Sequence, residues 1–277
     1  MAADDAQAPC RWMAWCAYEG TEFNGWQSQP GGGAVQDVLE ARLAEIFGKP
    51  VRIHGAGRTD AGVHACAQVF HFDAAWGHET RKLSRALNVR LPGGVLIRRV
   101  RRAPEKFHAR FSATAKRYVY RWHEGEAPPW ERRLVRSLGH RRLDADAMHR
   151  AAQTLLGRHD FSSFGANRGD GSTDNPVKTL HVMEVRREGR RLAFTTIGSG
   201  YLFKMVRSLA GILERVGEGK MSVCDVAAIL ESRKRTHVVE TAPAHGLWLE
   251  RVYYRSSKFA GNRGVSDIFS VAKDERR

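Results

Sequence analysis

One aspartate is a candidate for chemistry because it lies in a segment otherwise built of small residues. Asp60 belongs to residues 54–65, in which three glycines and three alanines surround one arginine and one threonine. Small residues let the backbone turn tightly and approach a bulky partner, so the segment predicts a loop. A carboxylate on such a loop could act as a nucleophile, as a general base or as a turn-forming group that accepts backbone hydrogen bonds.

A pair of tyrosines gives a second candidate. Within residues 116–120, Tyr118 and Tyr120 share one face of a predicted strand. A tyrosine can stack on a nucleobase and still offer one polar oxygen, although core packing is the more common role. We expect core packing for Tyr120.

A third candidate is an arginine in residues 198–211. Arg207 follows Lys204 by about one helical turn, beside the small residues Ser208 and Gly211. This face suits a site that admits an anion, whereas most arginines are simply exposed on the surface. The segment is not a dinucleotide-binding fingerprint, because Phe203 replaces the last glycine of that motif.

The overall charge predicts a polyanionic partner. The 277 residues include 45 Lys and Arg against 30 Asp and Glu, a net charge of +15. The most basic stretch, residues 98–121, also contains aromatic side chains, a combination that suits contact with an RNA backbone and its bases. Net charge alone does not separate RNA from DNA or from an anionic membrane surface.

The cysteines and the N-terminus favour the cytoplasm. Four cysteines show neither CxxC pairing nor metal-type spacing, and His54, His64 and His71 lack a consistent ligand spacing, so we expect no metal. Unpaired thiols are typical of a reducing compartment. No apolar run approaches the length of a membrane span, and the acidic start differs from a signal peptide.

The hydrophobic periodicity predicts the order βαββαβ twice. In the first half we expect strands at 12–18, 51–53, 67–72 and 95–100, with helices at 35–46 and near 79–88. In the second half we expect strands at 116–122, 177–187, 191–197 and 247–254, with helices at 144–156 and 202–216 and an added helix near 223–231.

This order predicts an α+β fold of two ferredoxin-like (RRM-like) halves, residues 11–112 and 113–255. We expect the halves to form one extended mixed, mainly antiparallel sheet, with the helices on one face and a catalytic cleft between the halves. Residues 1–10 are expected to be a disordered lead, and residues 256–277 form a basic tail.

Residues 57–65 resemble the signature of the bacterial tRNA pseudouridine synthases of the TruA type. Further similarity to this family occurs at residues 18–27, 116–120, 198–211 and 242–249, so the resemblance spans nearly the whole chain. It implies an isomerase that converts uridine to pseudouridine at positions 38, 39 and 40 in the anticodon stem-loop of tRNA. It also implies no cofactor, and a homodimer in which one tRNA spans both subunits.

The resemblance also implies roles for individual residues. Asp60 would be the nucleophile and Arg207 its ion-pair partner, while Tyr118 would contact the target uracil and take part in proton transfer. Arg58 would enter the space left by the extruded base. The remaining substrate-binding candidates are Thr59, Lys204 and Leu247, the last as a pocket wall.

The rival interpretation is a tRNA-binding protein or RNA chaperone without activity. It needs the same basic surface but not an intact Asp60, Arg207 and Tyr118, and the sequence retains all three. A plain RRM module is disfavoured because the aromatic RNP signature is absent. DNA binding fits the motifs less well than an RNA role that reads the 2′-hydroxyl.

Overall fold

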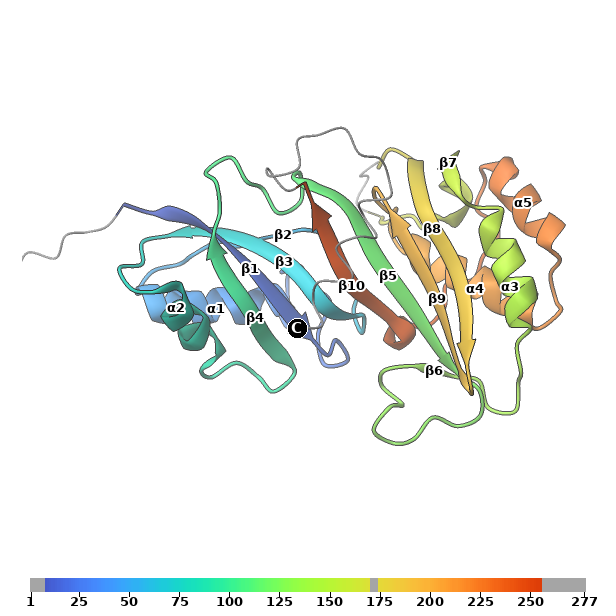
Figure 1. Cartoon of the computed structure of the whole chain (residues 1–277), viewed down its shortest axis with the longest axis horizontal. Helices are drawn as coiled ribbons and strands as arrows, with labels where there is room; N and C mark the ends of the chain where they lie inside the picture. The colour runs from blue at the N-terminus through green and yellow to red at the C-terminus, as the bar shows by residue number, and fades with distance from the viewer. Residues whose placement is uncertain (1–7, 170–173, 256–277) are drawn as a thin grey trace, which may run out of the picture.

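The computed structural model describes residues 8–169 and 174–255, which form one large, mostly antiparallel sheet with five α-helices (Figure 1). Residues 1–7 of the expected lead and the tail 256–277 lie outside the described residues. The predicted boundary of the lead is wrong at its end, because Cys10 already pairs with Ala74 as the first residue of a strand.

The sheet runs in the order β4-β1-β3-β10-β5-β9-β8-β7, with β2 paired to β3 and β6 paired to β5. Its strands in the first half are β1 Cys10–Tyr18, β2 His54–Gly55, β3 His64–Ala74 and β4 Val95–Arg102. Those in the second half are β5 Ala113–His123, β6 Arg136–Ser137, β7 Gly157–Asp160, β8 Val177–Glu188, β9 Arg191–Gly198 and β10 Leu247–Tyr254.

The last strand joins the two halves of the sheet. β10 lies between β3 and β5, parallel to β3 and antiparallel to β5 (Figure 1). The start of β10 places Trp248 opposite His64, the first residue of β3. Residues 56–63, called the Asp60 loop below, therefore end where the two halves of the sheet meet.

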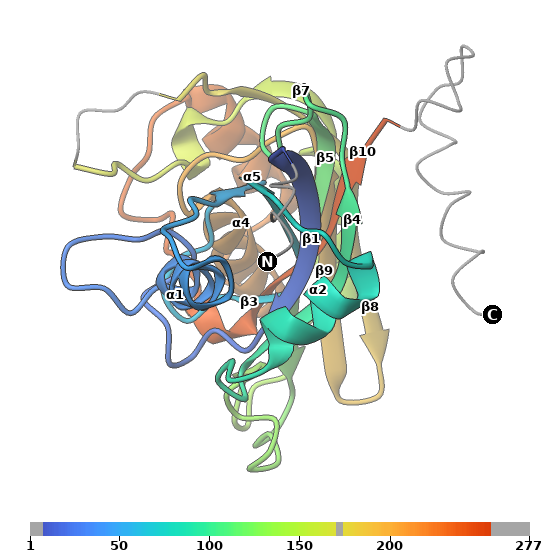
Figure 2. The ribbon, with the colours of Figure 1, turned by 90° about the vertical axis from the view of Figure 1, so that its left-hand side faces the viewer.

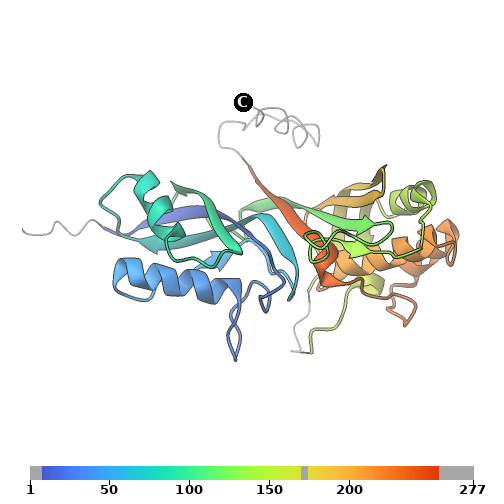
Figure 3. The same ribbon diagram turned by 90° about the horizontal axis from the view of Figure 1, so that it is seen from below.

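The helices are α1 Val35–Phe47, α2 Thr80–Asn88, α3 Ala145–Gln153, α4 Met205–Gly217 and α5 Val223–Ser232. Figures 2 and 3 show α1 and α4 on the same side of the sheet. α2 contacts β4, and α3 contacts β8 and α4. The main cluster of buried hydrophobic side chains includes residues of both halves, so burial of apolar surface stabilises the halves together.

One expected strand and one expected helix start are wrong for identifiable reasons. Residues 51–53 form no strand: Val51 and Ile53 are buried, but the amide of Ile53 donates to the Glu40 carboxylate rather than to a neighbouring strand. The helix expected from residue 202 begins at Met205, because Lys204 adopts the left-handed conformation with a φ of 58°. That conformation interrupts a right-handed helix.

Candidate functional site

An ion pair joins the two halves of the chain at the predicted site. Nη1 of Arg207, in the first turn of α4, lies 2.7 Å from Oδ2 of Asp60, and the two side chains are 14% and 20% exposed. The Nε of Arg207 donates to the carbonyl of Ala242 at 2.7 Å. The guanidinium is thus held on one side by backbone and presented to the carboxylate on the other, so a charge-assisted hydrogen bond fixes how the two groups are oriented.

The backbone of Asp60, rather than its carboxylate, forms the turn. The Asp60 carbonyl accepts a hydrogen bond from the Val63 amide at 3.1 Å. Gly62 between them has a φ of 76°, the positive value that a type II turn requires at its third residue. The turn-forming role therefore leaves the carboxylate available for the ion pair with Arg207.

The Asp60 loop is held by close backbone contacts from residues 20–26. The amide of Trp26 donates to the Thr59 carbonyl at 3.1 Å. Gly25, with a φ of 81°, lies so close that a Cβ atom there would be 2.5 Å from that same carbonyl oxygen. A Cβ atom on Gly20 would overlap the carbonyl oxygen of Val63. Trp26 itself is buried, so it supports the loop as a core residue.

Gly25→Ala is expected to displace the Asp60 loop. An alanine here must adopt a left-handed backbone conformation, and its methyl group would clash with the Thr59 carbonyl. We therefore expect the free energy of unfolding to fall by about 2 kcal/mol and the activity to fall clearly. Urea denaturation and a rate assay measure both effects.

Gly48→Ala is the matched control for that prediction. Gly48 has a φ of 66°, but a Cβ atom there would meet nothing within 4 Å. Gly48→Ala should lower the free energy of unfolding by about 1 kcal/mol and leave the reaction rate unchanged. Equal rates for the two variants would show that the contact of Gly25 does not position the loop.

The hydroxyl of Thr59 supports the loop through a hydrogen bond to Tyr18. It lies 2.8 Å from the Tyr18 hydroxyl at the end of β1. Gln68 of β3 is fully buried and donates from Nε2 to the carbonyl of Gly57 at 2.8 Å. Sequence reasoning missed both Tyr18 and Gln68, although a polar glutamine within an apolar strand was a usable signal, since buried polar groups need a partner.

Tyr118 lies in a mainly aromatic setting next to the site. It is 7% exposed, and its ring meets that of Tyr201 edge to face at a centroid distance of 5.1 Å. Burial raises the pKa of Tyr118, and the negative charge of Asp60 raises it further. The phenol is therefore protonated at neutral pH and can donate a hydrogen bond. Tyr120 is core, and its hydroxyl donates to Pro243.

The other predicted site residues differ in their exposure to solvent. Arg58 is exposed and makes no ion pair within the described part of the chain. Lys204 is partly exposed, with its ammonium 5.0 Å from the centre of the Phe203 ring. Leu247 is 5% exposed at the start of β10. The structure thus brings Asp60, Arg207 and Tyr118 into one region.

The small residues of α4 serve packing. Ser208 is buried and accepts a hydrogen bond from Arg235 at 2.9 Å. A Cβ atom on Gly211 would overlap the carbonyl oxygen of Glu240. The expected open face of the helix beside Arg207 is therefore wrong at these two positions, since both contact the segment that leads to Ala242.

The histidines do not form a metal site in the described ranges, where no group of three or more His, Cys, Asp or Glu side chains could hold a metal ion. The ring of His71 is stacked with that of His54 and meets that of His108 edge to face, and the Nδ1 of His71 accepts from the amide of Ala109. Burial, with the nearby His108, lowers the pKa of His71 to about 4.

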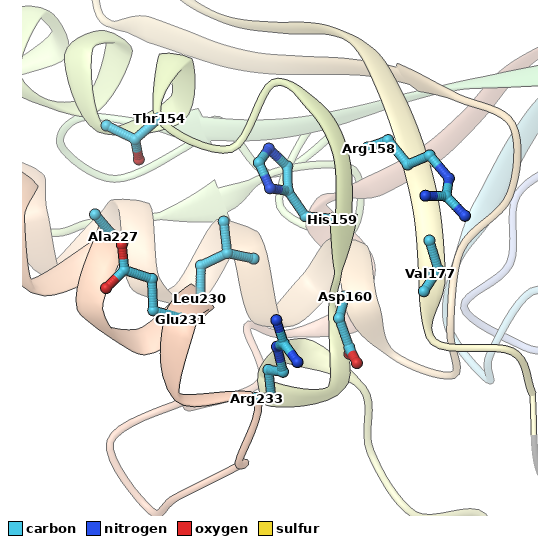
Figure 4. A pocket seen from close by; sticks show the side chains of 9 residues that line it. All are labelled: Thr154, Arg158, His159, Asp160, Val177, Ala227, Leu230, Glu231 and Arg233. Carbon is cyan, nitrogen blue, oxygen red and sulfur yellow. The ribbon is translucent and has the colours of Figure 1, made fainter.

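A pocket of about 470 Å³ lies in the second half of the chain, between α3, β7 and α5 (Figure 4). Figure 4 shows Arg158, Asp160, Glu231 and Arg233 around it. Its lining contains none of the predicted site residues.

Within the described ranges, no helix has the length and apolar character needed to cross a membrane.

Comparison with known proteins identifies the family. A family model described as "tRNA pseudouridine synthase" matches residues 14–112 and 151–255. Asp60 lies in the first matched segment and Arg207 in the second, while Tyr118 lies between the two.

Individual relatives agree with this match. The chain is 44% identical to tRNA pseudouridine synthase A of Beijerinckia indica subsp. indica over 86% of this chain and 91% of that protein. It is 42% identical to the protein of that name from Maricaulis maris (86% and 95%), and 41% identical to that from Geobacillus kaustophilus (86% and 92%). A solved Cbf5-Nop10-Gar1 complex gives a TM-score of only 0.34 at 12% identity, over 86% of this chain and 57% of that one.

Proposed function

The chain belongs to the tRNA pseudouridine synthase family and is an isomerase that acts on uridine in tRNA; from this premise we propose that it modifies positions 38, 39 and 40 of the anticodon stem-loop. The proposal is supported by the ion pair between Asp60 and Arg207, which presents a carboxylate between the two halves. The net charge of +15 suits an RNA substrate.

In the proposed reaction Asp60 is the nucleophile. Its carboxylate attacks the flipped uridine at C6 of the base or at C1′ of the ribose, and the bond between N1 and C1′ breaks. The uracil rotates, C5 bonds to C1′, and the bond between the Asp60 carboxylate and the nucleotide breaks, which frees the carboxylate. The proton on C5 leaves and N1 gains a proton. The reaction rearranges atoms without net oxidation or hydrolysis, so it requires no cofactor. Arg207 supplies the counter-charge of the carboxylate and orients it for attack.

Tyr118 is proposed to contact the uracil and to take part in proton transfer. The raised pKa of its phenol keeps the hydroxyl protonated before the reaction, so it can donate to a uracil oxygen while its ring contacts the base. Its packing against Tyr201 fixes the orientation of the ring.

The remaining candidates are proposed to hold the extruded nucleotide and its neighbours. A base in a stacked stem must leave the stack before its glycosidic bond can be reached. Arg58, exposed two residues before Asp60, would occupy the vacated space. Lys204 would contact the backbone, Leu247 would form the pocket wall, and Thr59 would hold the loop through Tyr18.

We also propose that residues 11–112 and 113–255 are two ferredoxin-like units with a catalytic cleft between them. The strand order supports this division, because β4-β1-β3-β2 in the first half corresponds to β10-β5-β9-β8 in the second. In each half the two middle strands are the first and third of a βαββαβ unit. Asp60 would come from one unit and Arg207 from the other.

We propose that the enzyme acts as a homodimer on one tRNA. Light scattering should then give twice the chain mass of 31.1 kDa, whereas a particle of that single mass would contradict the dimer. The cytoplasm is the proposed location, because the substrate is tRNA and the described cysteines are free thiols, as expected in a reducing compartment.

The test is pseudouridine mapping on tRNA transcripts with uridines at positions 38, 39 and 40, in buffer without added cofactor. We expect pseudouridine at these positions, and none there in a matched transcript with cytidines at all three. Modification elsewhere in the tRNA would keep the family activity and contradict the proposed positions. Tight binding without any product would favour the RNA-binding protein without activity.

A further inference from the structure

We propose that Lys116 binds a backbone phosphate of the RNA beside the flipped uridine, an inference that rests on the proposed function. Lys116 lies on β5 two residues before Tyr118, so the two side chains share one face of the strand. Lys116 is the first residue of segment 116–120, one of the segments that resemble the family. Neither the resemblance nor the proposed reaction gives this lysine a role.

The side chain of Lys116 reaches the Asp60 loop. A Cβ atom built on Gly57 would lie 3.2 Å from Cε and 3.4 Å from Nζ of Lys116. The ammonium group therefore lies against the loop three residues before Asp60. Hydrogen bonds hold both the loop and the strand in place here. Gln68 donates to the Gly57 carbonyl, and the Tyr201 hydroxyl donates to the Lys116 carbonyl at 3.3 Å.

The ammonium of Lys116 has no acidic partner among the residues that the structure describes. Within the described part of the chain Lys116 forms no ion pair, and the charged groups that act on it are Arg110, from the segment before β5, and Lys178 of β8. Neither of these two cations has a carboxylate partner there, and Arg110 instead lies over the Phe111 ring at 5.7 Å. Tyr118 and Tyr201, also nearby, are uncharged at neutral pH.

These three cations define a site that requires an anion. Burial, with Arg110 and Lys178, lowers the pKa of Lys116 to about 8, because both destabilise the charged form of the lysine. In RNA the base and the ribose of the target are neutral, and the phosphates on either side carry the negative charge. A phosphate bound here would neutralise the cluster and hold the strand next to Asp60.

Lys116→Met tests the charge at nearly constant side-chain length. We expect its Kd for tRNA to rise about 10-fold, as for the loss of a charge-assisted hydrogen bond. The slope of log Kd against log salt concentration should fall by about 0.7 to 1, the value for one phosphate contact. Lys82→Met, which removes an exposed lysine from α2, is the control and should change neither quantity.

The pH dependence separates Lys116 from other basic residues. In the wild type, Kd should be constant below about pH 8 and rise above it, because Lys116 loses its proton and its charge there. In Lys116→Arg the guanidinium keeps its charge, so the rise above pH 8 should disappear while affinity at pH 7 is retained. A general loss of fold would not produce this pattern.

The outcomes distinguish the two proposals. Wild-type protein that makes no pseudouridine at positions 38, 39 and 40 contradicts the proposed function. Wild-type activity together with an unchanged Kd and salt slope in Lys116→Met contradicts the phosphate site alone. A rise of Kd above pH 8 that persists in Lys116→Arg also overturns it, because another group would then be losing its proton.

Discussion

Asp60→Asn is expected to lower the rate of pseudouridine formation by at least about 1,000-fold, as for removal of an enzymatic nucleophile. Asparagine has nearly the same shape and can still accept a hydrogen bond from Arg207, so the loop and the fold should be retained. The amide oxygen is a poor nucleophile. Single-turnover assays on tRNA, with enzyme in excess, measure the change in the chemical step directly.

The control is Asp73→Asn, on β3. Asp73 is also paired with an arginine, Arg11, at 2.7 Å, but on an exposed part of the sheet. It should leave the single-turnover rate within about twofold, since exposed ion pairs contribute little. Binding of tRNA by Asp60→Asn should stay close to wild type. A variant that binds and still turns over at the wild-type rate would remove Asp60 from its proposed role.

Arg207→Met is the second substitution with a large expected effect. It leaves the Asp60 carboxylate, which is 20% exposed, without its counter-charge, and it frees the Ala242 carbonyl. We expect the free energy of unfolding to fall by about 2 kcal/mol, below the range for a fully buried pair because this one is partly hydrated. We also expect activity to fall by at least about 100-fold. Urea denaturation and the single-turnover assay measure the two effects.

A double-mutant cycle identifies the source of the instability. If the unpaired charge is responsible, Arg207→Met should cost about 1 kcal/mol less in the Asp60→Asn background. Arg191→Met is the control, because Arg191 pairs with Glu131 at the surface and is 62% exposed. It should cost no more than about 1 kcal/mol. Equal costs of Arg207→Met in both backgrounds would place the effect in the contact with Ala242.

Regular periodicity made much of the fold predictable. The strand expected at 247–254 has those bounds in the structure, and α1 and α5 differ from expectation by one residue at their C-terminal ends. Prediction failed at two features that hydrophobic periodicity does not signal. The Glu40 carboxylate accepts a hydrogen bond from the amide of Ile53, and Lys204 takes a left-handed conformation.

The site was accessible mainly through family resemblance. Asp60 and Arg207 are 147 residues apart in sequence, and no local pattern indicates that they meet. The sequence also gives no signal for the two backbone contacts that position the pair. These are the hydrogen bond from Arg207 to the Ala242 carbonyl and the close approach of Gly25 to the Asp60 loop. Any residue can supply a carbonyl, and a glycine does not reveal which backbone it approaches.

The central position of β10 has a consequence for the order of folding. While the chain is being synthesised, β3 and β5 have no strand between them until residues 247–254 have left the ribosome. The N-terminal elements can fold early, as domains commonly do during translation, but their edge strands stay open. The Ala242 carbonyl that orients Arg207 also comes late in the chain. The proposed reactive centre is therefore completed only after residues 242–254 have been synthesised.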